Sequence, residues 1–172
     1  PIVVTDPGLM KAGVASRVLA VLDDAKIPYS LYDSVEPNPS VNTVERIRKQ
    51  YLDEGCGGFI AIGGGSSMDA AKGAAARVTR PKKTVNQMGG LLKVLKRIPP
   101  FIAVPTTAGT GSETTIAAVV TDTQTHHKYA IMDLRLIPRY AVLDPELTLG
   151  LPPHITSTTG MDALTHAVEG YL

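Results

Sequence analysis

The chain has 172 residues, 44% of them hydrophobic and 19% charged, as expected for a globular protein large enough for one α/β domain. Its formal net charge is +1 and its basic residues are scattered, which argues against nucleic acid as a partner. No apolar run is long enough to cross a membrane, and no signal peptide is visible. The single cysteine, Cys56, excludes a disulfide framework and favours a reducing compartment, so we expect a cytoplasmic protein.

Short apolar runs and amphipathic stretches alternate along the first part of the chain. Strands are expected at 2–5, 29–33 and 59–62, and helices at 14–22, 41–51 and 68–76. The third strand is apolar throughout, as a strand buried on both faces should be. This alternation predicts a Rossmann-like parallel sheet with flanking helices on both faces.

The second part of the chain is less regular. A further strand is expected at 101–105, followed by a loop rich in hydroxyl groups and glycine at 106–112. Residues 117–121 and 128–132 flank a polar turn that contains His126 and His127, a pattern that predicts a β-hairpin. The last strand of the sheet is expected at 140–144.

Pro152 and Pro153 end the α/β part and open a helical one. We therefore expect an α/β domain at 1–150 and the beginning of an all-helical domain at 151–172. Pro1 leads straight into a strand, and Leu172 ends inside a helical pattern without a cap. From these two features we expect the chain to be a truncated piece of a longer protein.

A glycine-rich turn joins the strand at 59–62 to the next helix. It reads Gly63-Gly64-Gly65-Ser66, where backbone N–H groups and the positive end of the helix dipole favour an anion such as a pyrophosphate. The spacing is not that of the G-x-G-x-x-G fingerprint, and the first βα turn lacks such glycines. The sequence thus predicts a phosphate site after the third strand; the alternative is a tight turn in which glycine only avoids a clash.

Other polar side chains follow the expected strands. Asp33 ends the second strand, where a carboxylate accepts hydrogen bonds from the adenosine ribose and repels a 2′-phosphate, so it predicts NAD over NADP. Thr106, Thr107 and Thr110 follow a later strand and suit phosphate or nicotinamide contacts. Lys128 begins a strand from which it could approach a ribose or phosphate. The alternatives are a turn-capping aspartate, ordinary turn chemistry and a solvated lysine.

Asp162 and His166 lie four positions apart in the last expected helix. At this spacing the two side chains point the same way, so they could share one divalent cation such as Zn²⁺ or Fe²⁺. A metal site needs at least three ligands, and such pairs also occur on ordinary helix surfaces. Taken alone, the pair is a weak signal.

Four segments together resemble the iron-containing (group III) alcohol dehydrogenases, a group that includes lactaldehyde reductase and 1,3-propanediol dehydrogenase. They are GGGSSMD at 63–69, PTTAGTGSE at 105–113, Asp144-Pro145, and TGMDALTHAVE at 159–169. The resemblance covers essentially the whole chain. It implies an N-terminal dinucleotide-binding domain and a C-terminal helical domain, with metal and substrate in the cleft between them.

The resemblance also implies roles for individual residues. The pyrophosphate would be held by Gly64, Gly65 and Ser66, with Asp69 nearby, and the adenosine ribose by Asp33. The cofactor would be lined by Thr106, Thr107 and Thr110, while Lys128 would reach the nicotinamide-side ribose and Leu147 would pack on the cofactor. The first two metal ligands would be Asp162 and His166. The remaining ligands of the family are histidines on later helices. Ala117 departs from lactaldehyde reductase, which has an asparagine near the substrate at this position, so a diol substrate is not implied.

The implied reaction is hydride transfer between a primary alcohol, or its aldehyde, and NAD, with a divalent metal polarising the alcohol oxygen. Fe²⁺ is the usual ion, and Zn²⁺ is also possible. A homodimer or higher homo-oligomer is expected, and these residues alone should be inactive because two ligands do not define a metal site. The alternatives are a zinc-dependent polyol dehydrogenase, a dehydroquinate-synthase-like enzyme, and a nucleotide-binding fragment without chemistry.

Overall fold

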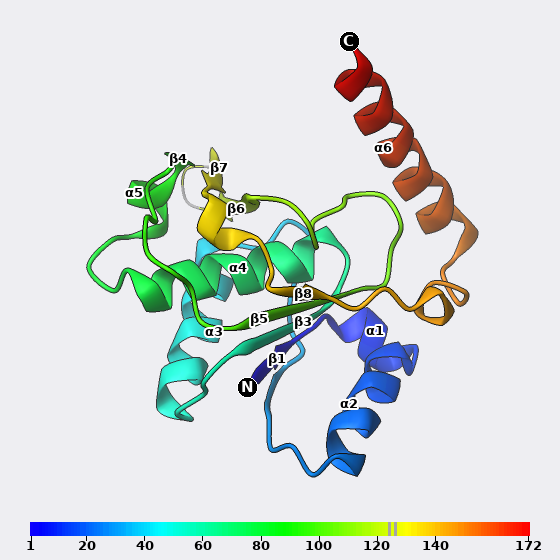
Figure 1. Ribbon diagram of the computed structural model, residues 1–172, viewed down its shortest axis with the longest axis horizontal. Helices are drawn as coiled ribbons and strands as arrows, with labels where there is room; N and C mark the ends of the chain where they lie inside the picture. Colours follow the sequence, from blue (N-terminus) through cyan, green and yellow to red (C-terminus); the bar gives the residue numbers. More distant parts are fainter. Residues whose placement is uncertain (124, 126) are drawn as a thin grey trace.

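A five-stranded parallel sheet organises the fold in the computed structural model, which describes residues 1–123, 125 and 127–172 (Figure 1). The strand order is β2-β1-β3-β5-β8. The strands are β1 (Ile2–Val4), β2 (Ser30–Tyr32), β3 (Phe59–Gly63), β5 (Phe101–Pro105) and β8 (Tyr140–Ala141). The helices are α1 (Pro7–Lys11), α2 (Val14–Asp24), α3 (Val41–Asp53), α4 (Gly65–Thr79), α5 (Val85–Met88) and α6 (Pro153–Tyr171), with short 3₁₀ turns η1 (Leu134–Leu136) and η2 (Pro145–Leu147). The predicted Rossmann-like sheet is confirmed.

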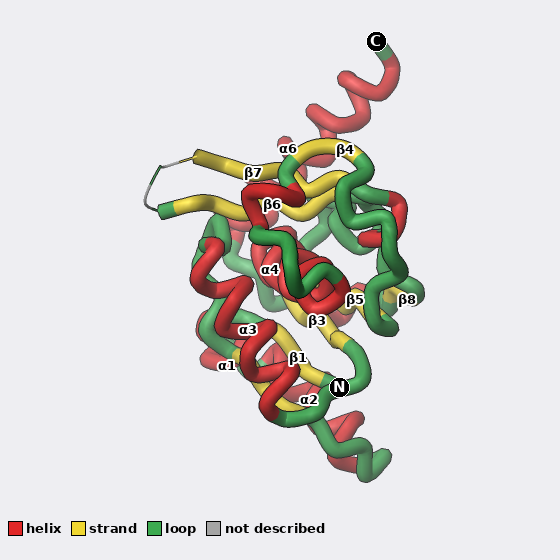
Figure 2. The backbone as a smooth tube through the Cα atoms, turned by 90° about the vertical axis from the view of Figure 1, so that its left-hand side faces the viewer, coloured by secondary structure: helices red, strands yellow, loops and turns green. Residues whose placement is uncertain are grey.

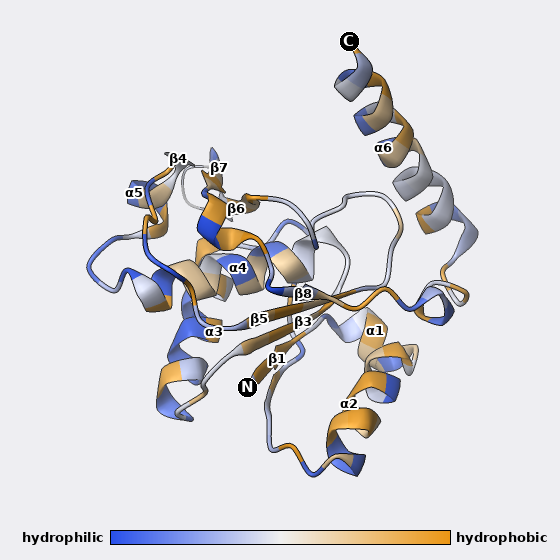
Figure 3. Ribbon diagram, in the orientation of Figure 1, coloured by the Kyte–Doolittle hydropathy of each residue, from blue (hydrophilic) through white to orange (hydrophobic). Residues whose placement is uncertain are grey.

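Helices cover both faces of this sheet, α2 on one side and α3 with α4 on the other (Figure 1). All five residues of β3 are buried as a result, and Figure 3 shows the central strands as hydrophobic ribbon. On the α3 side, Tyr51 stacks on Phe59 at 4.6 Å between ring centroids, and Phe59 lies 6.0 Å from Phe101. These aromatic contacts fix α3 against the middle of the sheet.

The order of the strands determines where a ligand can bind. The chain passes from β1 to β2 on one side and then to β3 on the other side of β1. The loops after β1 and β3 therefore diverge above the sheet and leave a crevice at their carboxyl ends, which is where open α/β sheets bind ligands.

A smaller sheet, with the order β4-β7-β6, contains β4 (Gly90–Leu91), β6 (Ala117–Asp122) and β7 (His127–Met132). It lies on the side of α4 that faces away from the main sheet, so α4 is enclosed between two sheets (Figure 2). The antiparallel pairing of β6 with β7 confirms the predicted hairpin. His127 begins β7, so its predicted place in the turn is wrong, whereas His126 lies outside the described residues.

Helix α6 projects away from the rest of the molecule (Figure 1). None of its described residues is buried, and Met161, Leu164 and Val168 are 50–61% exposed. The predicted helical segment after residue 151 is present, while the proposed domain boundary near residue 150 stays a prediction. No helix in the described part of the chain is long and apolar enough to cross a membrane.

The enclosure of α4 buries a lysine. Lys72 has no exposed surface, and burial lowers its pKa from 10.5 to about 8, although the carboxylates of Asp69 and Glu113 act in the opposite direction. In the unfolded chain this lysine is hydrated, so between about pH 8 and pH 10.5 the unfolded state binds more protons than the folded state. The contribution of Lys72 to the free energy of unfolding therefore rises with pH across this window, and below it the buried charge costs stability.

We predict that the free energy of unfolding of the wild type rises relative to that of Lys72→Met as the pH increases from about 8 to about 10, by roughly 1–3 kcal/mol. Urea denaturation at several pH values measures this difference. Lys49→Met is the control, because the Lys49 side chain is 76% exposed on α3 and is not enclosed between the two sheets. A difference for Lys72→Met that stayed constant across this pH range would contradict the lowered pKa.

Candidate functional site

A cavity of about 480 Å³ lies above the carboxyl ends of the parallel strands. Loops that follow four different strands contribute to its lining, together with Thr159 of α6. The lining residues are Asp6, Pro7, Gly8, Val35, Glu36, Pro37, Gly64, Gly65, Ser66, Ser67, Thr107, Thr110 and Thr159. An adjoining cavity of about 390 Å³ shares Gly64 and Thr107 and adds Thr106 and Leu147. Most of the residues predicted to contact the cofactor thus meet at one place.

The glycine-rich turn forms the floor of this site. Gly63 has a φ of 147°, and a Cβ atom there would lie 2.5 Å from Ser67 Oγ, so the turn requires glycine. Gly64 is the N-cap of α4, and no described side chain caps this helix, whereas Ser40 caps α3 by accepting a hydrogen bond from the Thr43 N–H. The first N–H groups of a 15-residue helix are therefore free for an anion.

The loop between β5 and β6 (106–116), which we call the threonine-rich loop, packs directly on the two glycines that start α4. A Cβ atom on Gly64 would lie 3.2 Å from Thr107 Oγ1, and one on Gly65 would lie 3.2 Å from Thr110 Cγ2. Thr106 is buried, and its backbone N–H donates to the carbonyl of Gly63 at 3.1 Å. The loop thereby forms one wall of the cavity, with Thr107 and Thr110 at its surface.

Asn38 connects two of the predicted cofactor residues and was not identified from the sequence. Its backbone N–H donates to Ser66 Oγ at 3.3 Å, and its Oδ1 accepts a hydrogen bond from Lys128 Nζ at 3.1 Å. Asn38 has a φ of 54°, a conformation that asparagine tolerates better than most residues. The sequence signal for Asn38 was the Pro37-Asn38-Pro39 turn, because an asparagine between two prolines indicates a turn with an unusual backbone conformation.

The segment after β2 contains two carboxylates. Asp33 is exposed directly after the strand, and its Oδ1 accepts a hydrogen bond from Ser34 Oγ at 3.0 Å. Glu36, which sequence analysis missed, lines the cavity. Burial alone would raise the pKa of Glu36, but hydrogen bonds from Ser40 and Thr43 outweigh this effect and hold its pKa below the ordinary value. The negative charge of Glu36 is therefore stabilised by hydrogen bonds from Ser40 and Thr43 at the start of α3.

Asp69 lies one turn into α4 and is not among the residues that line the cavity. Its Oδ1 accepts a hydrogen bond from Ser112 Oγ and its Oδ2 one from the Val119 N–H, both at 3.1 Å. Burial raises the pKa of Asp69 above its ordinary value, although these bonds and the Lys72 ammonium act against it. The contacts of Asp69 are therefore with the threonine-rich loop and the small sheet, and its place near the pyrophosphate stays a prediction.

Asp162 and His166 lie on one side of α6, with Asp162 Oδ1 3.6 Å from His166 Nε2. Their side chains are 44% and 60% exposed, respectively. Within the described residues no group of three potential ligands (His, Cys, Asp or Glu) is assembled. The pair begins about one helical turn beyond Thr159, and of these three residues only Thr159 lines the cavity.

Gly109 explains how α6 comes so close to the loop. A Cβ atom on Gly109 would lie 2.8 Å from Thr159 Cβ and in still closer contact with the Thr159 carbonyl oxygen. Real Cβ atoms do not approach backbone this closely, so only glycine lets the loop and the helix meet. The contact was not foreseen, because the sequence shows the glycine but not its neighbour.

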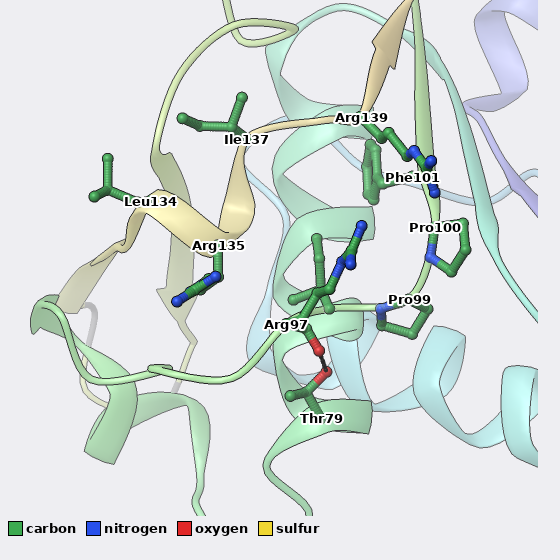
Figure 4. A pocket seen from close by; sticks show the side chains of 10 residues that line it. Thr79, Arg97, Pro99, Pro100, Phe101, Leu134, Arg135, Ile137 and Arg139 are labelled. Atoms are coloured by element: carbon green, nitrogen blue, oxygen red, sulfur yellow. Dashed lines mark hydrogen bonds between the residues drawn. The ribbon is translucent and has the colours of Figure 1, made fainter.

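A separate cavity of about 650 Å³ lies at the opposite end of the sheet (Figure 4). Phe101, the first residue of β5, lines it, whereas Thr107 lies beyond the carboxyl end of that strand. Arg97, Arg135 and Arg139 make this cavity positively charged. No residue that was predicted to bind cofactor or metal lines it.

Comparison with known proteins gives consistent matches. The chain matches the family model of iron-containing alcohol dehydrogenases over residues 1–145. Alcohol dehydrogenase 4 of Schizosaccharomyces pombe is 45% identical over 171 residues, which cover 99% of the chain and 40% of that protein. A crystal structure of a 1,3-propanediol oxidoreductase matches with a TM-score of 0.93 and 40% identity, over 97% of this chain and 44% of that one.

A second crystal structure is that of sulfoacetaldehyde reductase from Bifidobacterium kashiwanohense in complex with NAD⁺. It matches with a TM-score of 0.85 and 36% identity, over 99% of this chain and 45% of that one. The chain thus spans less than half of each of these proteins. Because the family model covers most of its residues, the chain belongs to the iron-containing alcohol dehydrogenase family.

Proposed function

We propose that the chain is the dinucleotide-binding part of an NAD-dependent, iron-type alcohol dehydrogenase that transfers a hydride between a primary alcohol, or its aldehyde, and NAD. The observation that carries this proposal is the cavity where the uncapped start of α4, the threonine-rich loop and α6 meet. Membership of the family supports the reaction class. The NAD⁺ complex of the sulfoacetaldehyde reductase supports the cofactor.

The chain's own residues would bind and orient the dinucleotide. The N–H groups of Gly65 and Ser66 and the Ser66 hydroxyl would hold the pyrophosphate, because the uncapped helix start favours an anion. Asp33 would accept hydrogen bonds from the adenosine ribose, and Lys128, held by Asn38, would reach the other ribose. Leu147, only 4% exposed in η2, would give the cofactor an apolar contact. Together these contacts would present the nicotinamide ring toward α6.

Asp162 and His166 would supply an oxygen and a nitrogen ligand to one divalent cation. Their 3.6 Å separation on one side of α6 fits this role, since both Fe²⁺ and Zn²⁺ accept such ligands. A cation bound there would act as a Lewis acid toward the alcohol oxygen. Two residues do not complete a metal site, so we expect the 172 residues of this chain to be inactive on their own.

We also propose that 151–172 begins a separate helical domain. The exposed apolar side chains of α6 support this proposal, because such a helix face normally packs on other helices. The relatives are more than twice as long as this chain, in keeping with additional elements that would supply the missing ligands. The cytoplasmic location and the homo-oligomeric state stay predictions from the sequence. The family match favours this reaction over the zinc-dependent and dehydroquinate-synthase-like alternatives.

We predict that the protein binds NAD more tightly than NADP by at least about tenfold, or about 1.4 kcal/mol, because the Asp33 carboxylate repels a 2′-phosphate. Asp33→Asn removes the charge and should bring the two dissociation constants closer together. Isothermal titration calorimetry with each dinucleotide measures both effects.

Asp24→Asn is the control for this experiment. Asp24 is an exposed carboxylate at the end of α2. The variant should leave the preference unchanged, because α2 leads into the amino end of β2 whereas Asp33 follows its carboxyl end. If neither dinucleotide bound, the proposed pyrophosphate site would be wrong. Equal affinity for NAD and NADP in the wild type would remove the role of Asp33.

We predict that Asp162→Ala and His166→Ala each reduce the iron or zinc content of the full-length protein at least about tenfold, because loss of a ligand weakens coordination. Elemental analysis of the purified protein measures the metal content. Glu169→Ala is a matched control, since Glu169 is an exposed carboxylate on the same helix. Unchanged metal content in either variant would exclude that residue as a ligand.

A further inference from the structure

The threonine-rich loop lacks regular structure of its own. Between β5 and β6 its internal hydrogen bonds are short-range turns, such as the Thr114 N–H to the Gly111 carbonyl at 2.9 Å. Yet Thr107 and Thr110 of this loop form a wall of the dinucleotide cavity. Contacts from outside the loop must therefore fix its position.

Lys72 supplies the main contact from outside. Its Nζ donates to the carbonyl oxygens of Ser112 at 2.7 Å, Thr115 at 2.8 Å and Ala117 at 3.1 Å. It also lies 3.1 Å from Thr115 Oγ1. Lys72 is fully buried, and its partners span the end of the loop and the start of β6. One ammonium group thus gathers backbone oxygens that would otherwise repel one another in a dry environment.

Asp69, one turn earlier on α4 than Lys72, also binds the threonine-rich loop to this helix. Its carboxylate binds the Ser112 hydroxyl and the Val119 N–H, so it holds the same loop and the same strand as Lys72. Ser112 in turn donates its backbone N–H to Thr110 Oγ1 at 3.3 Å. Thr110 packs on Gly65, where the predicted pyrophosphate site begins. A continuous set of contacts therefore runs from the middle of α4, through the loop, back to the first turn of α4.

We propose that Lys72 and Asp69 are positioning residues, which hold the threonine-rich loop in its binding-competent shape before the dinucleotide arrives. The choice of NAD as the ligand rests on the proposed function, whereas the ordering of the loop does not. Neither residue is expected to touch the cofactor, because their side-chain ends face Ser112, Thr115 and the start of β6.

A loop that is ordered only part of the time weakens binding in proportion to the ordered fraction. If Lys72→Met reduces this fraction to about one tenth, the dissociation constant for NAD should rise about tenfold. Thr115→Val keeps the side-chain shape and removes one acceptor of Lys72, together with the longer contacts of the same hydroxyl to the carbonyls of Ser112 at 3.4 Å and Ala117 at 3.5 Å. About a two- to threefold rise is expected.

The test combines hydrogen exchange, resolved by residue, with isothermal titration of NAD on the same proteins. In both variants, amide exchange should accelerate across 107–118 and stay unchanged in β1 and β3. Saturating NAD should restore the protection of the loop. Lys49→Met, at an exposed lysine of α3, serves as the matched control and should change neither measurement.

The two arms separate this inference from the proposed function. Wild-type protein that fails to bind NAD overturns the proposed function, while the exchange data still test the loop. Unchanged exchange in the loop, or equal acceleration in the loop and in β1 and β3, overturns the positioning role. If Lys72→Met does not fold, Thr115→Val decides: local acceleration supports the proposal, and its absence overturns it.

Discussion

The start of α4 is the feature on which the rest of the structure depends. A helix normally satisfies its first N–H groups with a capping side chain, and losing that cap costs about 1 kcal/mol. Gly64 provides no such side chain, and glycine also lets another group approach the backbone closely. The helix therefore keeps a partial positive charge exposed at the point where the loops of four strands meet.

The fold stabilises this uncapped helix by enclosing it. One side of α4 packs on the main sheet and the other on the small sheet (Figure 2). As a result, small residues such as Ala70, Ala71 and Ala74 have no exposed surface. Close packing on both sides holds the helix start in place although its own N-terminus is not satisfied. The small sheet thus contributes to the site in two ways. It packs on α4, and it contains β6, the strand that follows the threonine-rich loop.

The sequence was informative where the signal is local. An apolar run followed by glycines predicts a buried strand and a turn, and both were found at 59–65. The threonines after β5 were correctly predicted to follow the carboxyl end of that strand, because an apolar run marks the strand that precedes them. Asp33 was likewise foreseen at the end of β2, because strand ends are visible in the hydrophobic pattern.

Features that depend on distant partners could not be predicted in this way. In the sequence Lys72 resembles an ordinary helix lysine, since its acceptors lie 40 to 45 residues later in the chain. Asp69 was expected near the pyrophosphate, but a sequence does not show which way a carboxylate turns. The close contact of Gly109 with Thr159, like the bridge through Asn38, exists only once the chain has folded.

The central claim is that the uncapped start of α4, and not the arginine-lined cavity at the other end of the sheet, binds the dinucleotide. The most direct measurement is a titration with NAD followed by the backbone amide resonances of the protein. The largest shifts are predicted at 64–67 and 106–110, where N–H groups would meet the phosphates. Shifts centred on Arg97, Arg135 and Arg139, with the amides of 64–67 unmoved, would contradict the account.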